Sequence, residues 1–368
     1  MAQVQKYFDT VGVGAYLITA FSALLVGYKY LLPKFVSRVT EKQALWLAGA
    51  TFLVLLVVFA IAYPIANSGL VAGGSDRDDN LNVATTALLH GRYPYYFRGY
   101  LGSPTHSLPG SLVLAVPFVL IGNSAYQNFF WLAIFFIAMR LYLKDGRLAL
   151  LMLWASLLLS PGLLHELVTG GDLISNSLYV LLFMLFMVNA VPRSDRSCWL
   201  KAGSAILLGV GLSSRANFLL LLPLVFSMLV QIAGWKAAAK YVGLTCMTFG
   251  AITIPFYLYD PQGFYPLHAL GIITQFHSIL PFAGRIVPLV GGITALALSF
   301  QHMDCGGLAL LRNSAMVQAF PVFCVIVLSM VQARGLDFAY AGYGLNFLFF
   351  GALASWANLA GRGACSDG

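Results

Sequence analysis

Apolar residues in this chain occur in long runs that are separated by short polar segments. A helix of roughly 20 apolar residues crosses about 30 Å of hydrocarbon, and most of the runs approach or exceed that length. About ten or eleven membrane spans are therefore expected, at approximately residues 11–32, 44–66, 126–143, 148–161, 176–191, 203–214, 217–233, 240–258, 286–300, 314–332 and 338–356. Several runs are short, so neighbouring runs could form one broken helix or a tilted hairpin. The pattern predicts an all-α polytopic membrane protein with a single integral domain, residues 1–368.

The composition agrees with a chain that lies in lipid. It is 60% hydrophobic and only 9% charged, and its mean hydropathy is +0.82. A soluble domain is about half apolar and about a quarter charged. The five cysteines are scattered without a CxxC spacing, which favours buried apolar residues over disulfides or metal ligands. No removable signal peptide is predicted.

The net charge of +8 is distributed asymmetrically along the chain. Four loops between spans each carry two or three Lys or Arg residues: PKFVSRVTEKQ, MRLYLKDGR, PRSDRSCWLK and GWKAAAK. Because cytoplasmic loops carry an excess of Lys and Arg, we assign these four loops to the cytoplasm. The positive charge therefore indicates membrane orientation, and no nucleic-acid partner is expected.

This orientation requires that residues 109–121 do not cross the membrane. The run LPGSLVLAVPFVLIG offers about 13 apolar residues and contains Pro117, which is typical of an interfacial or re-entrant helix. Residues 67–125 then form one long external segment with two membrane-associated pieces. Residues 259–285 form the second external loop. We expect function where these external segments meet.

Three acids follow a predicted span directly in the first external segment: Asp76, Asp78 and Asp79. One interpretation is helix capping, because Ser75 to Asp78 fits the capping-box pattern and acids stabilise a first helical turn. The other is that one carboxylate is a general base in a dry cleft at the lipid boundary, where desolvation raises its pKa. The oxygens of Asp76 and Asp78 could also hold a divalent cation, Mg²⁺ or Mn²⁺.

The residues after Asp79 predict an amphipathic helix at the outer membrane–water interface. Its apolar positions share one face: Leu81, Ala84 and Leu88. Its polar positions fall largely on the other face: Asn82, Thr85 and Thr86. Gly91, followed by Pro94, predicts the end of this helix.

The order of these features resembles a known family. A span, D-x-D(D), an amphipathic helix closing in ALLHGRYPYY (residues 87–96) and a short proline-bearing apolar helix follow one another. This order is similar to the GT-C superfamily of integral-membrane glycosyltransferases, in particular its polyprenyl-phosphate-sugar-dependent, mannosyltransferase-like members. LLLSPGLLHELVTGGDLISNSLYVLL and GVGLSSRANFLLLLPLVF extend the resemblance loosely to about residue 235. The chain departs from the family in its shorter length, its lack of a soluble external domain and an apparent extra span before the first external segment.

The resemblance implies an essential Asp in the first large external loop, a position that Asp76, Asp78 and Asp79 occupy. Asp78 and Asp76 are the leading candidates for the base, and Asp79 is expected to be a cap or partner. The resemblance implies inverting transfer of a monosaccharide from a polyprenyl-phosphate donor to a glycan or lipid-linked acceptor. The site would face the external or periplasmic side of the cell (inner) membrane. No cofactor is required, and a divalent cation is optional.

Further external residues are candidates for substrate binding. Arg215, in SSRANF, could hold a phosphate bidentately, or it could anchor the chain at the lipid headgroups. Arg285 could be a second phosphate contact. Tyr265, His268 and His277 suit sugar binding, although such residues are expected in any interfacial loop.

The segment HELVTGGD places His165, Glu166 and Asp172 around Gly170 and Gly171. It is not an HExxH zinc motif, because a Thr stands where the second His is required. The two glycines indicate a turn or a close approach to a ligand. Asp172 could cap the next helix, whereas Glu166 would be costly near lipid without a partner.

Two other classes of protein remain as alternatives. A transporter or lipid flippase would place ionisable residues near the middle of broken spans and would usually show internal repeats, which the sequence lacks. A polysaccharide polymerase or ligase would carry basic residues in a large external loop, whereas the charge of the external segments here is balanced.

Overall fold

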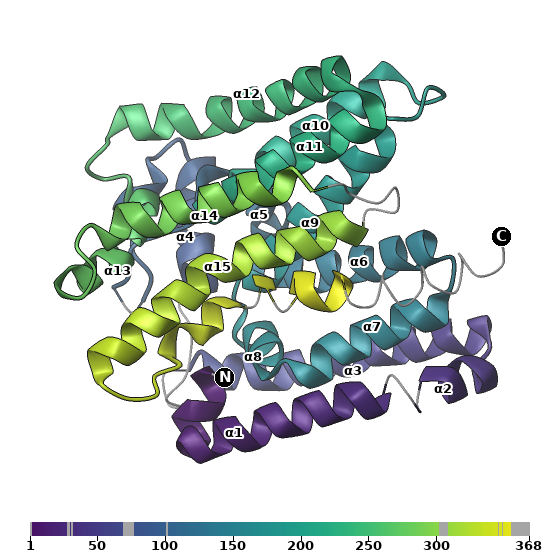
Figure 1. Cartoon of the computed structure of the whole chain (residues 1–368). Coiled ribbons are helices and arrows are strands. Elements are labelled where there is room, and N and C mark those ends of the chain that lie inside the picture. The colour runs from purple at the N-terminus through teal and green to yellow at the C-terminus, as the bar shows by residue number, and fades with distance from the viewer. Residues whose placement is uncertain are drawn as a thin grey trace.

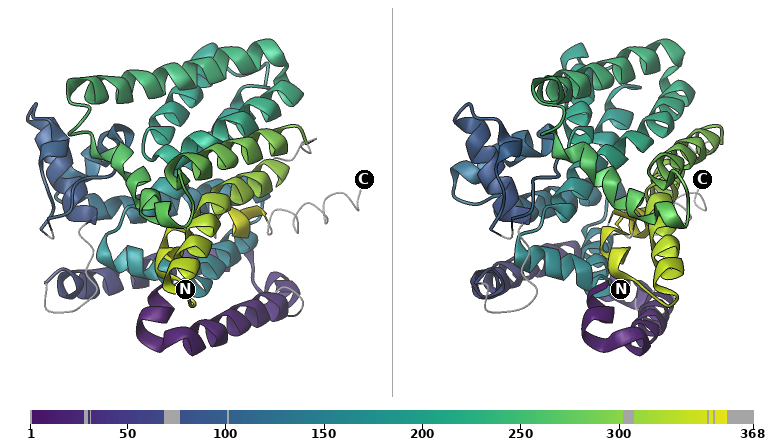
Figure 2. Two further views of the ribbon diagram at one scale, coloured as in Figure 1. Left: turned by 60° about the vertical axis from the view of Figure 1, so that its left-hand side comes forward. Right: turned by 90° about the vertical axis from the view of Figure 1, so that its left-hand side faces the viewer.

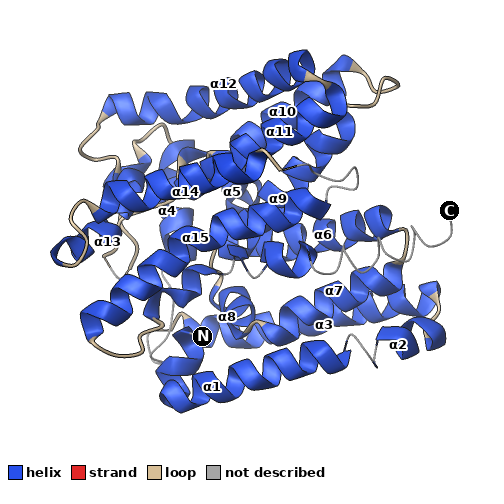
Figure 3. Ribbon diagram, viewed as in Figure 1, coloured by secondary structure: helices blue, strands red, loops and turns tan. Residues whose placement is uncertain are grey.

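The computed structural model describes residues 2–27, 30, 32–68, 77–100, 102–301, 308–344, 346–347 and 349–354. The regular structure of these residues is helical, as Figure 3 shows. Their only β pairing is an isolated bridge between Arg98 and Pro104. The all-α prediction is confirmed for the described part of the chain.

The α-helices follow one another along the chain (Figure 1) as α1 (Ala2–Val26), α2 (Leu32–Arg38), α3 (Glu41–Ala66), α4 (Arg77–Leu89), α5 (Pro109–Leu120), α6 (Gln127–Leu143), α7 (Gly146–Leu159), α8 (Pro161–Thr169), α9 (Leu173–Ala190), α10 (Cys198–Leu212), α11 (Leu222–Ala233), α12 (Trp235–Tyr259), α13 (Gly271–Thr274), α14 (Ala283–Ser299) and α15 (Leu308–Ala333). Short 3-10 segments connect them: η2 (Pro94–Tyr96), η3 (Ser124–Tyr126), η4 (Ala216–Leu221), η5 (Tyr265–Leu270), η6 (Gln275–Ser278) and η7 (Ala339–Gly344).

Among the described residues, six helical segments are long and apolar enough to cross a membrane: Glu41–Ala66, Ser124–Leu143, Leu173–Ala190, Ala216–Ala233, Trp235–Tyr259 and Ala309–Ala333. Helices α7 and α8 meet at 87° and would make a seventh span if counted together. This set is compatible with an integral membrane protein.

The larger expected number of spans is not reached among the described residues. Four apolar helices are too short: Val11–Ala20, Pro109–Leu120, Cys198–Leu212 and Ala283–Ser299. The run expected to span at 338–356 begins instead with η7 and includes residues outside the described set. The bend between α7 and α8 makes this pair either a broken span or a re-entrant loop. Residues 109–121 form the expected short helix, α5.

Local sequence signals set several helix ends. Thr40 and Gln43 form a capping box at the start of α3, which satisfies otherwise unpaired backbone donors. Ser160 accepts a hydrogen bond from the backbone of Leu163 at the start of α8. Gly91 has a φ of +68°, and α4 ends just before it, as the sequence predicts.

Helix α9 is the core of the bundle. Of its candidate span, 89% is buried, against 22% of the span in α3. It contacts α6, α8, α10 and α11. The apolar side chains that α3 leaves exposed therefore face the surroundings of the bundle, whereas α9 packs against protein on all sides.

The basic loops gather at one end of the bundle, on the right in Figure 1. Glu41 at the start of α3 accepts hydrogen bonds from Arg140 Nε and from the backbone N–H of Gly146, each at 2.8 Å. Arg147 donates to the carbonyl oxygen of Val36 at 2.7 Å. Helices α4 and α13 lie at the opposite end. The bundle thus separates the basic loops from the two predicted external segments.

Helices α4 and α5 form a small unit that projects to one side of the bundle (Figure 2). They pack through Leu81 and Ala84 of α4 and Leu112 and Ala115 of α5. The expectation that Thr85 lies on the polar, outer face of α4 is wrong. Thr85 is fully buried, because packing of α4 within this unit covers more than its apolar stripe.

Candidate active site

Asp78 lies in the first turn of α4 and is completely buried. Its Oδ2 accepts a hydrogen bond from the hydroxyl of Tyr63, near the end of α3. The side-chain amide of Asn67 donates to the same oxygen at 3.4 Å. Oδ1 is buried and has no hydrogen-bond partner in the described part of the chain. Asp78 therefore keeps one carboxylate oxygen available for a further contact.

The surroundings of Asp78 favour its protonated form. The pKa of Asp78 is raised to about 7; burial is the largest cause, and the charge of neighbouring Asp79 acts in the same direction. The hydrogen bond from Tyr63 acts in the opposite direction. A carboxylate with a pKa near neutrality combines an ionised fraction with useful basicity, which is what a general base requires.

The Gly170–Gly171 turn passes between two carboxylates. Gly170 ends α8 with a φ of +75°, and a Cβ there would lie 2.9 Å from Asp78 Oδ2. A Cβ on Gly171 would lie 2.1 Å from Glu166 Oε2. Only residues without a side chain allow this approach. The predicted turn is therefore present, and the groups that approach it are the carboxylates of Asp78 and Glu166.

Two ion pairs involve the acids on either side of the Gly170–Gly171 turn. Arg77 binds Glu166 of α8, and Arg215 Nη2 lies 2.7 Å from both carboxylate oxygens of Asp172. Asp78 itself has no cationic partner among the described side chains. This difference explains why the net effect of its surroundings is to raise the pKa of Asp78, although the hydrogen bond from Tyr63 opposes part of the effect of burial.

Asp172 is buried but stays ionised. Burial works to raise its pKa, yet the charges of Arg215 and Arg77, together with hydrogen bonds from Arg215 and Asn176, leave the pKa below its ordinary value. Ser107 also donates to Asp172 Oδ2, at 3.2 Å. Asp172 stands at the N-cap position of α9 but makes no side-chain cap hydrogen bond. Its contacts favour an ion-pair role over the capping interpretation.

Arg215 has one N–H donor that makes no hydrogen bond within the described part of the chain. Its Nε is buried without a hydrogen-bond partner, and a fifth of its side chain is exposed, since the relative exposure is 20%. Arginine can bind a carboxylate and an incoming phosphate at the same time because its guanidinium carries several donors. The proximity of Arg215 to the buried acids is compatible with the phosphate role predicted from the sequence.

The remaining predicted residues are distributed more widely. Asp76 lies outside the described residues, and the side chain of His268 is not described. Asp79 is partly buried beside Asp78, and His165 is partly buried beside Glu166.

The second external loop meets the first through several contacts: the Tyr93 hydroxyl donates to the carbonyl oxygen of Asp260 at 3.3 Å, and the Tyr95 ring packs against Phe264. Arg98 donates to the Tyr265 hydroxyl at 3.4 Å, and its guanidinium lies 5.8 Å from the centre of the Tyr265 ring. The ring of His277 accepts a hydrogen bond from the backbone of Phe282 at 3.2 Å, which stabilises a turn. Arg285 lies exposed in the first turn of α14. The structure thus connects the two predicted external segments without bringing His277 or Arg285 into the Asp78 cluster.

Sequence reasoning missed the groups that surround Asp78. Tyr63 and Asn67 come from the end of an apolar helix, and Asn123 donates to the Tyr63 hydroxyl at 2.6 Å. Asn82, one turn after Asp78, donates to Asn123 Oδ1 at 3.2 Å. A tyrosine or asparagine at a span end is common, so its only sequence signal was proximity to the acids.

The described residues contain no group of three or more His, Cys, Asp or Glu side chains that could hold a metal ion. The predicted pairing of Asp78 with Asp76 for Mg²⁺ or Mn²⁺ involves a residue outside the described set. Asp78, with its free oxygen, is the described residue available to such an ion.

Comparisons of the chain with protein-family models, with curated protein sequences and with solved structures gave no match.

Proposed function

We propose that this chain is an integral-membrane glycosyltransferase that moves a monosaccharide from a polyprenyl-phosphate donor to a glycan or lipid-linked acceptor, with Asp78 as general base. The observation that carries the proposal is the state of Asp78. It is buried, its pKa is raised to about 7, and its Oδ1 has no hydrogen-bond partner among the described residues. Two arginines, Arg77 and Arg215, make ion pairs with Glu166 and Asp172 on either side of the Gly170–Gly171 turn. The resemblance of its sequence context to the GT-C superfamily supports the choice of reaction.

The proposed reaction is a single displacement at the anomeric carbon. Asp78 Oδ1 accepts the proton of the acceptor hydroxyl while the acceptor oxygen bonds to the anomeric carbon. The bond from that carbon to the phosphate oxygen breaks, and the polyprenyl phosphate leaves with the electron pair. Attack opposite to the leaving group inverts the configuration. Arg215 is placed to stabilise the phosphate charge.

The burial of Asp78 adds a requirement to this mechanism. The relative exposure of Asp78 is 0%. An acceptor therefore reaches Oδ1 only when the residues that cover Asp78 move apart. Closure around the substrates would then exclude water, which strengthens the electrostatic contacts and prevents hydrolysis of the donor.

The position of the basic loops supports an external site. Loops rich in Lys and Arg face the cytoplasm in membrane proteins. These loops lie at the end of the bundle opposite α4 (Figure 1). Asp78 would then face the periplasmic or external side of the cell membrane, where a lipid-linked donor can arrive sideways through the bilayer.

The interior of the bundle favours an enzyme over a transporter. The buried polar side chains of α9 occupy its first turns and end at Tyr179, and the buried residues from Val180 to Val188 are apolar. The six candidate spans carry their Lys, Arg, Asp and Glu residues near their ends. A carrier places such residues near the middle of the membrane. No charged path through the described bundle connects its two ends.

The proposal is tested with the full chain in lipid nanodiscs and a panel of polyprenyl-phosphate monosaccharides. Donor consumption and release of polyprenyl phosphate are measured with membrane glycolipid extracts as acceptors. We expect transfer from at least one donor, and we expect Asp78→Asn to lower its rate by about 10²–10⁴-fold, the usual contribution of a general base. Full activity of Asp78→Asn would refute the assignment of the base.

A further inference from the structure

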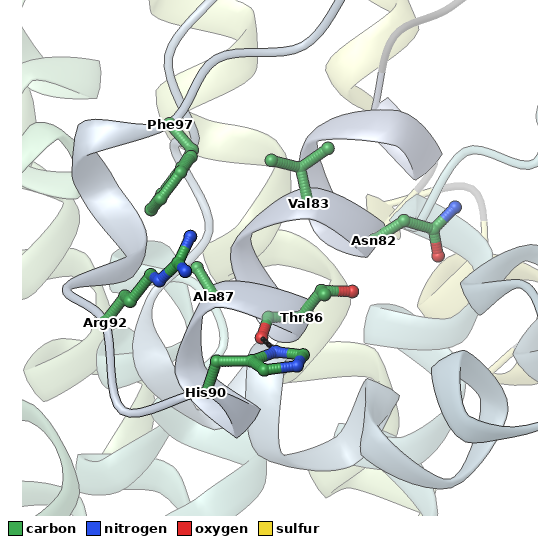
Figure 4. A pocket seen from close by; sticks show the side chains of 7 residues that line it. All are labelled: Asn82, Val83, Thr86, Ala87, His90, Arg92 and Phe97. Carbon is green, nitrogen blue, oxygen red and sulfur yellow. Dashed lines mark hydrogen bonds between the residues drawn. The ribbon is translucent and has the colours of Figure 1, made fainter.

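A second site lies on α4, apart from the charged cluster. The structure has an open hollow of about 340 Å³ whose wall is formed by Asn82, Val83, Thr86, Ala87, His90, Arg92 and Phe97. Figure 4 shows these side chains arranged around it. Neither Asp78 nor its ion-paired neighbours belong to this wall. A ligand of this hollow would therefore bind apart from Asp78 and the two ion pairs.

The charged groups of the hollow are cationic. No hydrogen bond or ion pair engages the guanidinium of Arg92 in the described part of the chain, and the side chain is exposed. His90 Nδ1 lies 2.8 Å from the carbonyl oxygen of Thr86. That oxygen can only accept, so Nδ1 carries the hydrogen and Nε2 remains for a ligand. The wall contains no acid, which favours an anion.

The rest of the wall is largely apolar. Val83, Ala87 and Phe97 contribute hydrocarbon surface beside the side chains of Arg92 and His90. In Figure 4 the Arg92 guanidinium and the Phe97 ring point toward one another. The side-chain amide of Asn82 is already engaged with Asn123 and with the backbone N–H of Ser124. Such a wall suits a ligand that joins an anionic group to hydrocarbon, rather than a free sugar.

The position of the hollow suits a lipid. Helices α4 and α5 project to one side of the bundle at the end opposite the basic loops (Figure 2). Apolar side chains are exposed beside the hollow, among them Val83 at 37%, Leu89 at 44% and Tyr96 at 59%. Aromatic and apolar residues next to a cation are typical of the level at which lipid headgroups lie.

We infer that this hollow binds the phosphate diester of an anionic bilayer phospholipid. The Arg92 guanidinium holds the phosphate oxygens, and His90 Nε2 and the Thr86 hydroxyl contact the polar headgroup. The glycerol backbone and the first acyl carbons lie along Val83 and Phe97. This inference does not depend on the glycosyltransferase proposal, because none of the residues in the wall takes part in the proposed reaction.

The test compares lipid binding by three forms of the full chain in nanodiscs of neutral phosphatidylcholine. The forms are wild type, Arg92→Gln, and Arg98→Gln as a matched loss of an exposed arginine in the same external segment. Phosphatidylglycerol with a photoreactive acyl chain is added at trace amounts, and crosslinked peptides are identified by mass spectrometry. Unchanged unfolding temperature shows that each variant is folded.

We expect crosslinks to α4 in wild type and Arg98→Gln, and about tenfold weaker labelling in Arg92→Gln, as for loss of a charge-assisted phosphate contact. Excess unlabelled phosphatidylglycerol should compete, and excess phosphatidylcholine or inorganic phosphate should not. Equal labelling of Arg92→Gln and wild type would overturn the inference. Competition by inorganic phosphate alone would assign a free-anion site instead, and preferential competition by polyprenyl phosphate would assign the lipid substrate, so either result also overturns it.

Discussion

Each end of the bundle contains an Arg–carboxylate ion pair, and the two pairs differ in how far they are exposed to solvent. At the basic end, Arg140 lies 2.8 Å from Glu41, and the two side chains are 41% and 46% exposed. At the other end, Arg215 lies 2.7 Å from Asp172, and the side chains are 20% and 1% exposed. An exposed pair contributes about 0–1 kcal/mol, whereas loss of one partner of a buried pair costs about 3–5 kcal/mol.

The difference in exposure indicates that the two ends have different roles. Exposed charges at the basic end interact with water at little cost, and in the proposed orientation they face the cytoplasm. At the other end the chain buries Asp78, Glu166 and Asp172 together and gives ion-pair partners to the last two alone. An unpartnered buried carboxylate is unfavourable for folding and useful for proton transfer. That contrast supports a catalytic interpretation of Asp78.

The largest expected effect on folding is that of Arg215→Ala. The change leaves the Asp172 carboxylate buried without its cation and should lower the free energy of unfolding by about 3–5 kcal/mol. Arg140→Ala, the matched change at the basic end, should lower it by about 1 kcal/mol or less. Thermal unfolding of the purified proteins in detergent measures both. Equal effects of the two substitutions would remove the distinction between the two ends.

Adding Asp172→Asn to Arg215→Ala refines this result. The second substitution removes the buried charge that the first leaves without a partner, so part of the lost stability should return. If the double variant is less stable than Arg215→Ala alone, the loss comes from packing and not from the isolated carboxylate.

Replacement of Asp78 by Asn should raise stability at high pH. The folded pKa of Asp78, about 7, lies above the ordinary value of 3.8 for an Asp side chain. Between these values the folded state binds a proton that the unfolded state has lost, so the stability of wild type falls as pH rises. Asn does not ionise. The variant should therefore match wild type near pH 4 and exceed it by the order of 1–3 kcal/mol at pH 8.

Unfolding temperatures at pH 4.5, 6 and 8 measure this difference. Asp195→Asn is the control, because the Asp195 side chain is 73% exposed at the basic end and should give no pH-dependent gain. A variant that loses stability as pH rises relative to wild type would mean that the Asp78 carboxylate is stabilised by its surroundings.

A smaller effect is expected from Tyr63→Phe. The Tyr63 hydroxyl donates to Asp78 and lowers its pKa, so its removal should raise that pKa above about 7. The midpoint of the pH–rate profile should move to higher pH by about one unit or less, and the rate should recover at the alkaline limit. Tyr126→Phe, a nearby tyrosine whose ring packs against Phe59, should leave the midpoint in place. A shift toward lower pH would contradict the assigned hydrogen bond.

Much of the fold could be predicted from the order of apolar, glycine and charged residues along the sequence. Apolar runs place most helices, Gly91 ends α4, and the shortness of residues 109–121 identifies α5. The charge pattern alone predicts that the basic loops lie together at one end of the bundle. Span number was harder to predict, because the apolar run at 203–214 belongs to a helix too short to pass as a span by itself. Burial of Thr85 depends on packing around α4, which helical periodicity does not contain.

The candidate site was predictable in its acids and not in its partners. The proximity of Asp76, Asp78 and Asp79 to a span, and the glycine pair beside Glu166, marked the two segments whose acids Asp78 and Glu166 the structure brings to one turn. The pairing of Arg77 with Glu166 joins residues 89 positions apart, so no local spacing encodes it. The bonds of Tyr63 and Asn123 likewise depend on how α3, α4 and η3 pack together.

The central claim is that Asp78 accepts a proton during sugar transfer, and the rate of a single turnover as a function of pH tests it most directly. Wild type should show a rate that rises with pH to a plateau, with a midpoint near 7, the pKa of Asp78. Asp79→Asn should show a similar rise with its midpoint at lower pH, because the charge of Asp79 contributes to the raised pKa of Asp78. Asp78→Asn should be slower by about 10²–10⁴-fold and without that rise. An Asp78→Asn variant that keeps the wild-type rate and pH dependence would contradict the account.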